Sequence, residues 1–82
     1  MPLKVSVISP ERTVFEGEVD AVTAPAFDGE VGILTGHAPM MTLLGKGVLR
    51  LGSGGQRFNV DGGFLQVVDN TVRVVTERAS AA

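Results

Sequence analysis

Short stretches in which apolar and polar residues alternate run along most of the chain. In LKVSVIS, residues 3–9, Leu or Val stands at positions 3, 5 and 7, which is typical of a half-buried strand. The same period of two recurs around residues 65–67 and 72–74. No window of roughly ten or more residues has a convincing helical period. The pattern therefore predicts short strands.

Glycine and proline divide these stretches. We expect Gly17 to break residues 12–25 into two strand pieces, and residues 24–30 to form a connection. The tail, residues 79–82, has a helix-favouring composition but is too short to form a helix alone. Turns or breaks are predicted at residues 9–12, 28–29, 45–47, 52–55, 61–63 and 69–70.

These elements predict an all-β protein. About eight to ten short antiparallel strands in one flat sheet would leave an apolar face uncovered, whereas two packed sheets or a flattened barrel bury it. The 82 residues suit a single domain, residues 1–82, with no linker or internal repeat. We therefore expect one flattened antiparallel β-sandwich or barrel.

Composition narrows the function. The net charge is −2, the seven basic residues are dispersed, and the aromatic residues are four Phe, so nucleic-acid binding is disfavoured. No cysteine is present to form a disulfide or thiolate metal site. The start of the chain does not resemble a secretory signal, and no apolar run approaches the roughly 18–20 residues needed to span a bilayer. We expect a soluble protein whose partners are proteins.

His37 is the obvious candidate for chemistry, as a general base or a metal ligand. There is no second histidine, so a metal site would need carboxylates from Asp28, Glu30 or Asp61. A small hydrolase that uses His37 with Asp28 or Asp61 is one alternative function. The simpler interpretation is that the imidazole fastens a loop through backbone hydrogen bonds or contacts a partner. We expect no catalytic residue, metal site or cofactor.

Two further features concern binding. Met40 and Met41 are adjacent, and adjacent strand residues point to opposite faces, so one of them is predicted to be an exposed apolar contact. A free-standing β-sandwich module that binds a ligand such as a carbohydrate is a second alternative. Such sites usually use Trp or Tyr platforms, and this chain has neither.

Three segments together resemble the epsilon subunit of rotary ATP synthases. GEVGILTGHAPMMT, residues 29–42, is similar to that family's G-E-hydrophobic-G-I, two residues, G-H-A-P, two apolar residues and T. VDGGFLQVVDNTVRVVTERA, residues 60–79, resembles its second signature, a strand that ends in G-G, an alternating strand, a turn and a last strand. The opening, residues 3–30, also fits, so the resemblance covers residues 3–79.

The resemblance implies a flattened sandwich of about ten strands in the central stalk of the enzyme. In that family the sandwich binds the gamma subunit along one side and rests on the polar loops of the membrane c-ring at one end. The subunit is non-catalytic and supports coupling of ion flow to ATP synthesis. The implied location is the cytoplasmic face of the bacterial inner membrane, with membrane association only through the complex.

The resemblance also implies site residues. Gly29, Glu30 and Val31 correspond to the segment that contacts the c-ring. The G-H-A-P loop is expected at the same end or at the border with gamma. Its residues are His37, Ala38, Pro39, Met40 and Met41.

One difference from the family limits what the resemblance implies for this chain. Members of the family usually continue for about fifty residues into a helical hairpin, whereas this sequence stops at Ala82. It is either a naturally short member or a chain cut at the domain boundary. In many members the hairpin inhibits ATP hydrolysis, and in some it binds ATP. We therefore expect no ATP binding and no inhibition of that kind from these residues.

Overall fold

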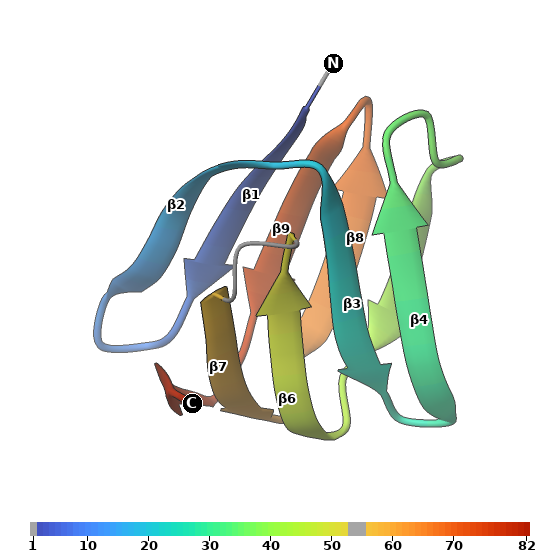
Figure 1. The fold of residues 1–82 in the computed structure, drawn as a ribbon. Coiled ribbons are helices and arrows are strands. Elements are labelled where there is room, and N and C mark those ends of the chain that lie inside the picture. The colour runs from blue at the N-terminus through green and yellow to red at the C-terminus, as the bar shows by residue number, and fades with distance from the viewer. Residues whose placement is uncertain (1, 53–55) are drawn as a thin grey trace.

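The structure is a computed structural model that describes residues 2–52 and 56–82. Ten strands account for most of these residues, and no helix occurs among them (Figure 1). The strands are β1 (Leu3–Ile8), β2 (Thr13–Val19), β3 (Ala21–Ala26), β4 (Gly29–Leu34), β5 (Met40–Leu43), β6 (Lys46–Leu51), β7 (Gln56–Asp61), β8 (Phe64–Val68), β9 (Thr71–Val75) and β10 (Arg78–Ala81).

The strands form two packed five-stranded sheets. Sheet A has the order β2-β1-β9-β8-β5, and sheet B has the order β10-β7-β6-β3-β4. The pairs between described strands are antiparallel except β1 with β9, which run parallel. The expected all-β sandwich of about ten strands is confirmed, with this one parallel pair added.

The core lies between the sheets and follows the alternation of the sequence. Leu3, Val5 and Val7 of β1 are buried, while Lys4 is exposed. Leu65 and Val67 of β8, Val72 and Val74 of β9 and Leu49 and Leu51 of β6 are also buried. They belong to one hydrophobic cluster with buried residues of β3, β4 and β7. Burial of these side chains is the main term that holds the sheets together.

The predicted break at Gly17 was wrong. β2 runs through Gly17, and the chain leaves sheet A for sheet B at Asp20, between β2 and β3 (Figure 1). Gly17 serves a different purpose, since a Cβ there would lie 3.2 Å from Cζ of Phe15. The Phe15 ring needs this space to pack between the sheets, where its centroid is 6.1 Å from that of Phe58.

Two other boundaries differ from the prediction. The expected connection at residues 24–30 is only the turn formed by Phe27 and Asp28, because β3 extends to Ala26 and β4 begins at Gly29. Residues 78–81, with part of the helix-favouring tail, form β10, because the edge of β7 offers backbone partners. The hairpin turn predicted at residues 52–55 lies largely outside the described residues, which omit 53–55.

Two connections between the sheets cross at one end of the sandwich. Gly62 and Gly63 lead from β7 to β8, and Thr76 and Glu77 lead from β9 to β10. The buried Thr76 hydroxyl donates to the carbonyl oxygen of Arg78 at 2.9 Å. This bond helps to hold the connection in which the chain passes from β9 in sheet A to β10 in sheet B.

Candidate subunit interface

The Gly29–Val31 segment begins β4, an edge strand of sheet B. Val31 packs against the core, whereas the Glu30 side chain is 57% exposed on the outer face of the sheet. Its Oε2 lies 2.7 Å from a guanidinium nitrogen of Arg50, which donates to it from β6. Glu30 is therefore presented to solvent as half of an ion pair.

Arg50 is a residue that sequence reasoning missed. The alternation in Lys46–Leu51 indicates that Arg50 faces outward, but it does not indicate its distance from Glu30. That distance depends on β3 lying between β4 and β6, and strand order is a long-range property. A pair this exposed contributes at most about 1 kcal/mol to stability, so its main effect is to orient the Glu30 carboxylate.

The G-H-A-P loop connects β4 to β5 and is held by backbone bonds. The His37 N–H donates to the Leu34 carbonyl oxygen at 3.1 Å. His37 Nδ1 lies 2.7 Å from the Ala38 carbonyl oxygen, and because a carbonyl only accepts, Nδ1 carries the proton of this bond. Gly36 has φ +84°, a conformation that side chains disfavour. The imidazole thus stiffens the loop, as the simpler interpretation expected.

Asn70, which follows β8 of sheet A, also holds the G-H-A-P loop. Asp69 and Asn70 form the predicted turn between β8 and β9, with φ of 49° and 58°. The Asn70 Oδ1 accepts a hydrogen bond of 2.7 Å from the Gly36 N–H. The sequence indicates the turn but gives no sign of this contact across 34 positions. Asn70 is the second functional candidate that sequence reasoning missed.

Met40 and Met41 point to opposite faces of β5, as the alternation predicts. Met40 is opposite Val67 and packs against the core, while Met41 is opposite Gln66 and is largely exposed. Met41 has apolar neighbours along the same side of the sandwich. Phe27, Leu34, Met41 and Leu43 are all between 60 and 69% exposed.

These exposed side chains mark the side where β4 and β5 are the edge strands of their sheets. The Phe27 N–H donates to the Leu43 carbonyl oxygen at 3.1 Å, which joins the two edges. The opposite edge strand of sheet A, β2, instead exposes Glu16 and Glu18. Leu34 points outward from sheet B, whereas Met41 and Leu43 point outward from sheet A, so the exposed apolar side chains flank this edge of the sandwich. Exposed apolar side chains along one edge are typical of a protein contact.

The Glu30 segment and the His37 loop lie at opposite ends of β4 (Figure 1). Six extended residues separate them by about 17 Å. Of the two placements expected for the G-H-A-P loop, the one at the same end as Glu30 does not fit this geometry, and the border with gamma stays a prediction. The cause is that EVGIL is a continuous strand, so its two flanking loops are held apart.

The same geometry places the aspartates considered as partners of His37 away from it. Asp28 lies in the turn before β4, and Asp61 is opposite Lys46 at the far end of sheet B from Leu34. In residues 2–52 and 56–82 no group of three His, Cys, Asp or Glu side chains could hold a metal ion. The arrangement does not support a hydrolase that uses His37 with either aspartate.

Taken together, these features define a small β-sandwich with exposed apolar side chains along one edge and an exposed ion pair on the outer face of sheet B. The sequence matches, over residues 2–82, the family described as ATP synthase, Delta/Epsilon chain, beta-sandwich domain. The chain belongs to this family. The resemblance drawn from the sequence motifs is confirmed.

Curated relatives agree with the match. The ATP synthase epsilon chain of Rhodopirellula baltica is 52% identical over an alignment of 81 positions, and the match covers 96% of this chain and 63% of that protein. The ATP synthase epsilon chain of Frankia casuarinae is 40% identical over an alignment of 82 positions, and the match covers 96% of each chain. The chain thus spans a little less than two thirds of the first of these relatives and nearly all of the second.

Among solved structures, a chain of the Euglena gracilis mitochondrial ATP synthase, in its OSCP/F1/c-ring assembly, matches with a TM-score of 0.88 and 25% identity. The match covers 98% of this chain and 53% of that one. A chain of the Tetrahymena thermophila mitochondrial enzyme, from its central stalk and c-ring, has the same fold with a TM-score of 0.80 at 18% identity.

No helix among the described residues is long and apolar enough to cross a membrane.

Proposed function

We propose that this chain is a non-catalytic rotor subunit of an ATP synthase, which binds the gamma subunit and docks it on the c-ring. The observation that carries the proposal is the family match over residues 2–82, together with a fold shared with chains of c-ring-containing assemblies. The subunit would couple ion flow to ATP synthesis by fastening gamma to the ring. Its place would be the cytoplasmic face of the bacterial inner membrane, held there by the complex.

The proposed contact with the polar loops of the c-ring is the start of β4. Gly29 and Glu30 are exposed at this end of the sandwich, and Glu30 carries a charge that a polar loop can recognise. An exposed carboxylate at a rim favours correct assembly more than it adds affinity. Arg50 belongs to this contact as the residue that orients Glu30.

The proposed contact with gamma is the other end and the adjacent edge. Because β4 separates the two loops, the ring cannot meet both at one end, and the border with gamma is the placement retained for His37, Ala38 and Pro39. Met41 and Leu34 lie beside this loop and offer exposed apolar area. Burial of such area is what drives most protein association.

The first experiment is a pull-down of the 82-residue chain with purified gamma subunit. We expect a stable complex, and the absence of binding by a chain with a native circular dichroism spectrum would contradict the proposal.

The second experiment is Glu30→Lys in the assembled complex. It should reduce docking on the ring and coupled ATP synthesis, while binding to gamma is retained. Glu18→Lys is the matched control, since it makes the same charge change on the outer face of sheet A. Unchanged coupling in Glu30→Lys would overturn the ring assignment but not the binding of gamma.

A further inference from the structure

The outer face of sheet B carries a different charge from the rest of the molecule. Its outward strand positions hold four cations and two carboxylates, although the whole chain has a net charge of −2. These are Lys46, Arg50, Arg57, Arg78, Glu30 and Asp61. The face is therefore cationic in an acidic protein.

The register of the strands explains why these charges are close together. Arg50 of β6 is directly opposite Arg57 of β7, and Lys46 is opposite Asp61, which is opposite Arg78 of β10. Opposite residues in adjacent strands are neighbours on one face of the sheet. Like charges directly opposite, such as Arg50 and Arg57, are unfavourable unless an anion lies nearby. Glu30 supplies one carboxylate, and it is bonded to Arg50.

The outer face of sheet A shows that this imbalance is not a general property of the surface. Its outward positions carry Lys4 and Arg73, and they also carry Glu16 and Glu18. Arg73 is in line with Ser6 and Glu16, and Lys4 is opposite Glu18. The charges of sheet A are thus balanced.

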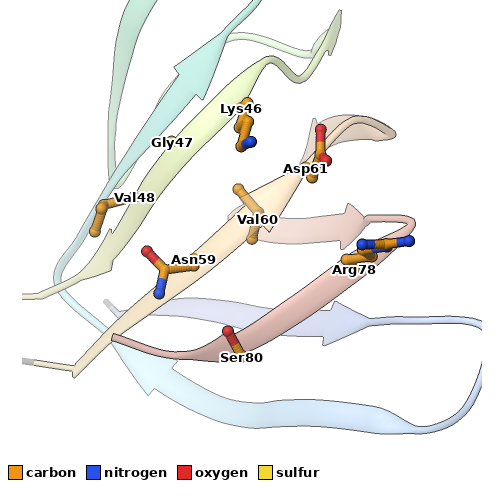
Figure 2. A pocket seen from close by; sticks show the side chains of 8 residues that line it. All are labelled: Lys46, Gly47, Val48, Asn59, Val60, Asp61, Arg78 and Ser80. Atoms are coloured by element: carbon orange, nitrogen blue, oxygen red, sulfur yellow. The ribbon is translucent and has the colours of Figure 1, made fainter.

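The cationic face is also hollowed. A pocket of about 330 Å³ is lined by residues of β6, β7 and β10, with Lys46, Asp61 and Arg78 at one end and Val48 and Asn59 towards the other (Figure 2). A second pocket, of about 400 Å³, is lined by Glu30, Arg50 and Arg57 among others.

The two pockets adjoin, since Gly47 and Val48 line both, and together they are called the groove here. Val48 is 38% exposed, and Pro25 lines the second pocket beside it. A Cβ at position 47 would lie 2.9 Å from Cβ of Pro25, so glycine allows the floor residues to pack closely. Pro25, Gly47 and Val48 are its apolar residues, and around them lie four cationic side chains and the carboxylates of Glu30 and Asp61.

We propose that this groove binds an acidic segment of a partner protein that places an apolar side chain over Val48. Its carboxylates would face Lys46 and Arg57, for which no ion pair is found within the described residues. The two carboxylates of the face disfavour a polyphosphate chain, and the face has no aromatic side chain for bases to stack on. Glu30 and Arg50 line the groove and also belong to the proposed ring contact, whereas Lys46 and Arg57, which would meet the carboxylates, do not.

The test is a titration of the ¹⁵N-labelled 82-residue chain, followed by NMR, with the acidic peptide Ac-EGLEEGLEEG-NH₂. We expect shifts confined to the residues that line the groove and their neighbours, largest near Lys46, Val48 and Arg57, with a Kd of about 0.1–1 mM that rises with salt. The peptide in which Gln replaces every Glu should bind much more weakly.

Two double variants make the test specific. Lys46→Gln with Arg57→Gln should weaken binding about three- to tenfold, because exposed ion pairs are individually modest. Lys4→Gln with Arg73→Gln removes the same charge from sheet A and should leave the affinity unchanged.

Three results would overturn the proposal. The first is equal weakening by both double variants, which would indicate attraction by net charge alone. The second is the absence of shifts in the groove. The third is tighter binding at the groove of dT₂₀ or of vesicles of phosphatidylglycerol and phosphatidylcholine, which would favour a nucleic acid or a membrane surface.

Discussion

Gly63→Ala should be among the most destabilising single substitutions in this chain. Gly63 has φ +100°, and a Cβ there would overlap the Val75 carbonyl oxygen and lie 2.7 Å from Cα of Thr76. Both neighbours are backbone atoms of the connection between the sheets, so neither can turn aside as a side chain would. Non-bonded carbons prefer about 3.5–4.0 Å, and the two connections would have to separate.

The magnitude follows from two terms. Strain at a positive φ is about 1–3 kcal/mol, and forced overpacking adds about 1–3 kcal/mol. A chain of 82 residues has a free energy of unfolding of about 4–12 kcal/mol. The substitution therefore removes a large share of the stability and should lower Tm by more than about 10 °C.

The assay is thermal and urea unfolding followed by circular dichroism, because the chain has no Trp or Tyr for intrinsic fluorescence. Gly32→Ala is the matched control, since a Cβ there meets no atom within 4 Å and its φ is not positive. We expect Gly32→Ala to stay within about 0.5 kcal/mol of the parent chain. Equal stability of the Gly63 and Gly32 variants would refute the reasoning from the crossed connections.

The remaining predictions concern three residues. Asn70→Gly keeps the turn but removes the acceptor for the Gly36 N–H, so hydrogen exchange at Gly36 should accelerate and binding to gamma should weaken. Asn70→Asp keeps an acceptor oxygen and should restore slow exchange and binding to gamma. Identical exchange rates at Gly36 in the two variants would contradict this role of Asn70. Thr76→Val should lower the free energy of unfolding by about 1–2 kcal/mol in urea titrations, while Thr76→Ser, which keeps the hydroxyl, should lower it less. Glu30→Gln should change Tm little, since its ion pair is exposed, and a loss above about 1 kcal/mol would show that the pair is structural.

The strands were largely predictable because each alternates over a core that is buried on one side only. LKVSVI and TVRVV are clear examples, and their inward residues are the buried ones. β10 was not predictable in this way, since RASA has no apolar alternation and is a strand only because β7 is beside it.

The arrangement of the candidate site was less predictable than the strands. Sequence reasoning selected Glu30 and His37 as candidates but left open whether their loops lie at one end, because motif spacing carries no information about strand direction. Arg50 and Asn70 were missed for a related reason. Each acts through a partner more than a dozen positions away, and only the order of strands brings the pairs into contact.

The parallel pairing of β1 with β9 has a consequence for biosynthesis. β1 lies inside sheet A between β2 and β9, so its second partner strand is synthesised long after β1 itself. Until residues 71–75 leave the ribosome, one edge of β1 is unpaired and its apolar face is only partly covered. Contacts this distant in sequence slow folding, because the chain must close a long loop before they form. The sandwich is therefore expected to form in one late step, once residues 71–75 are available, and its earlier strands depend on protection from aggregation until then.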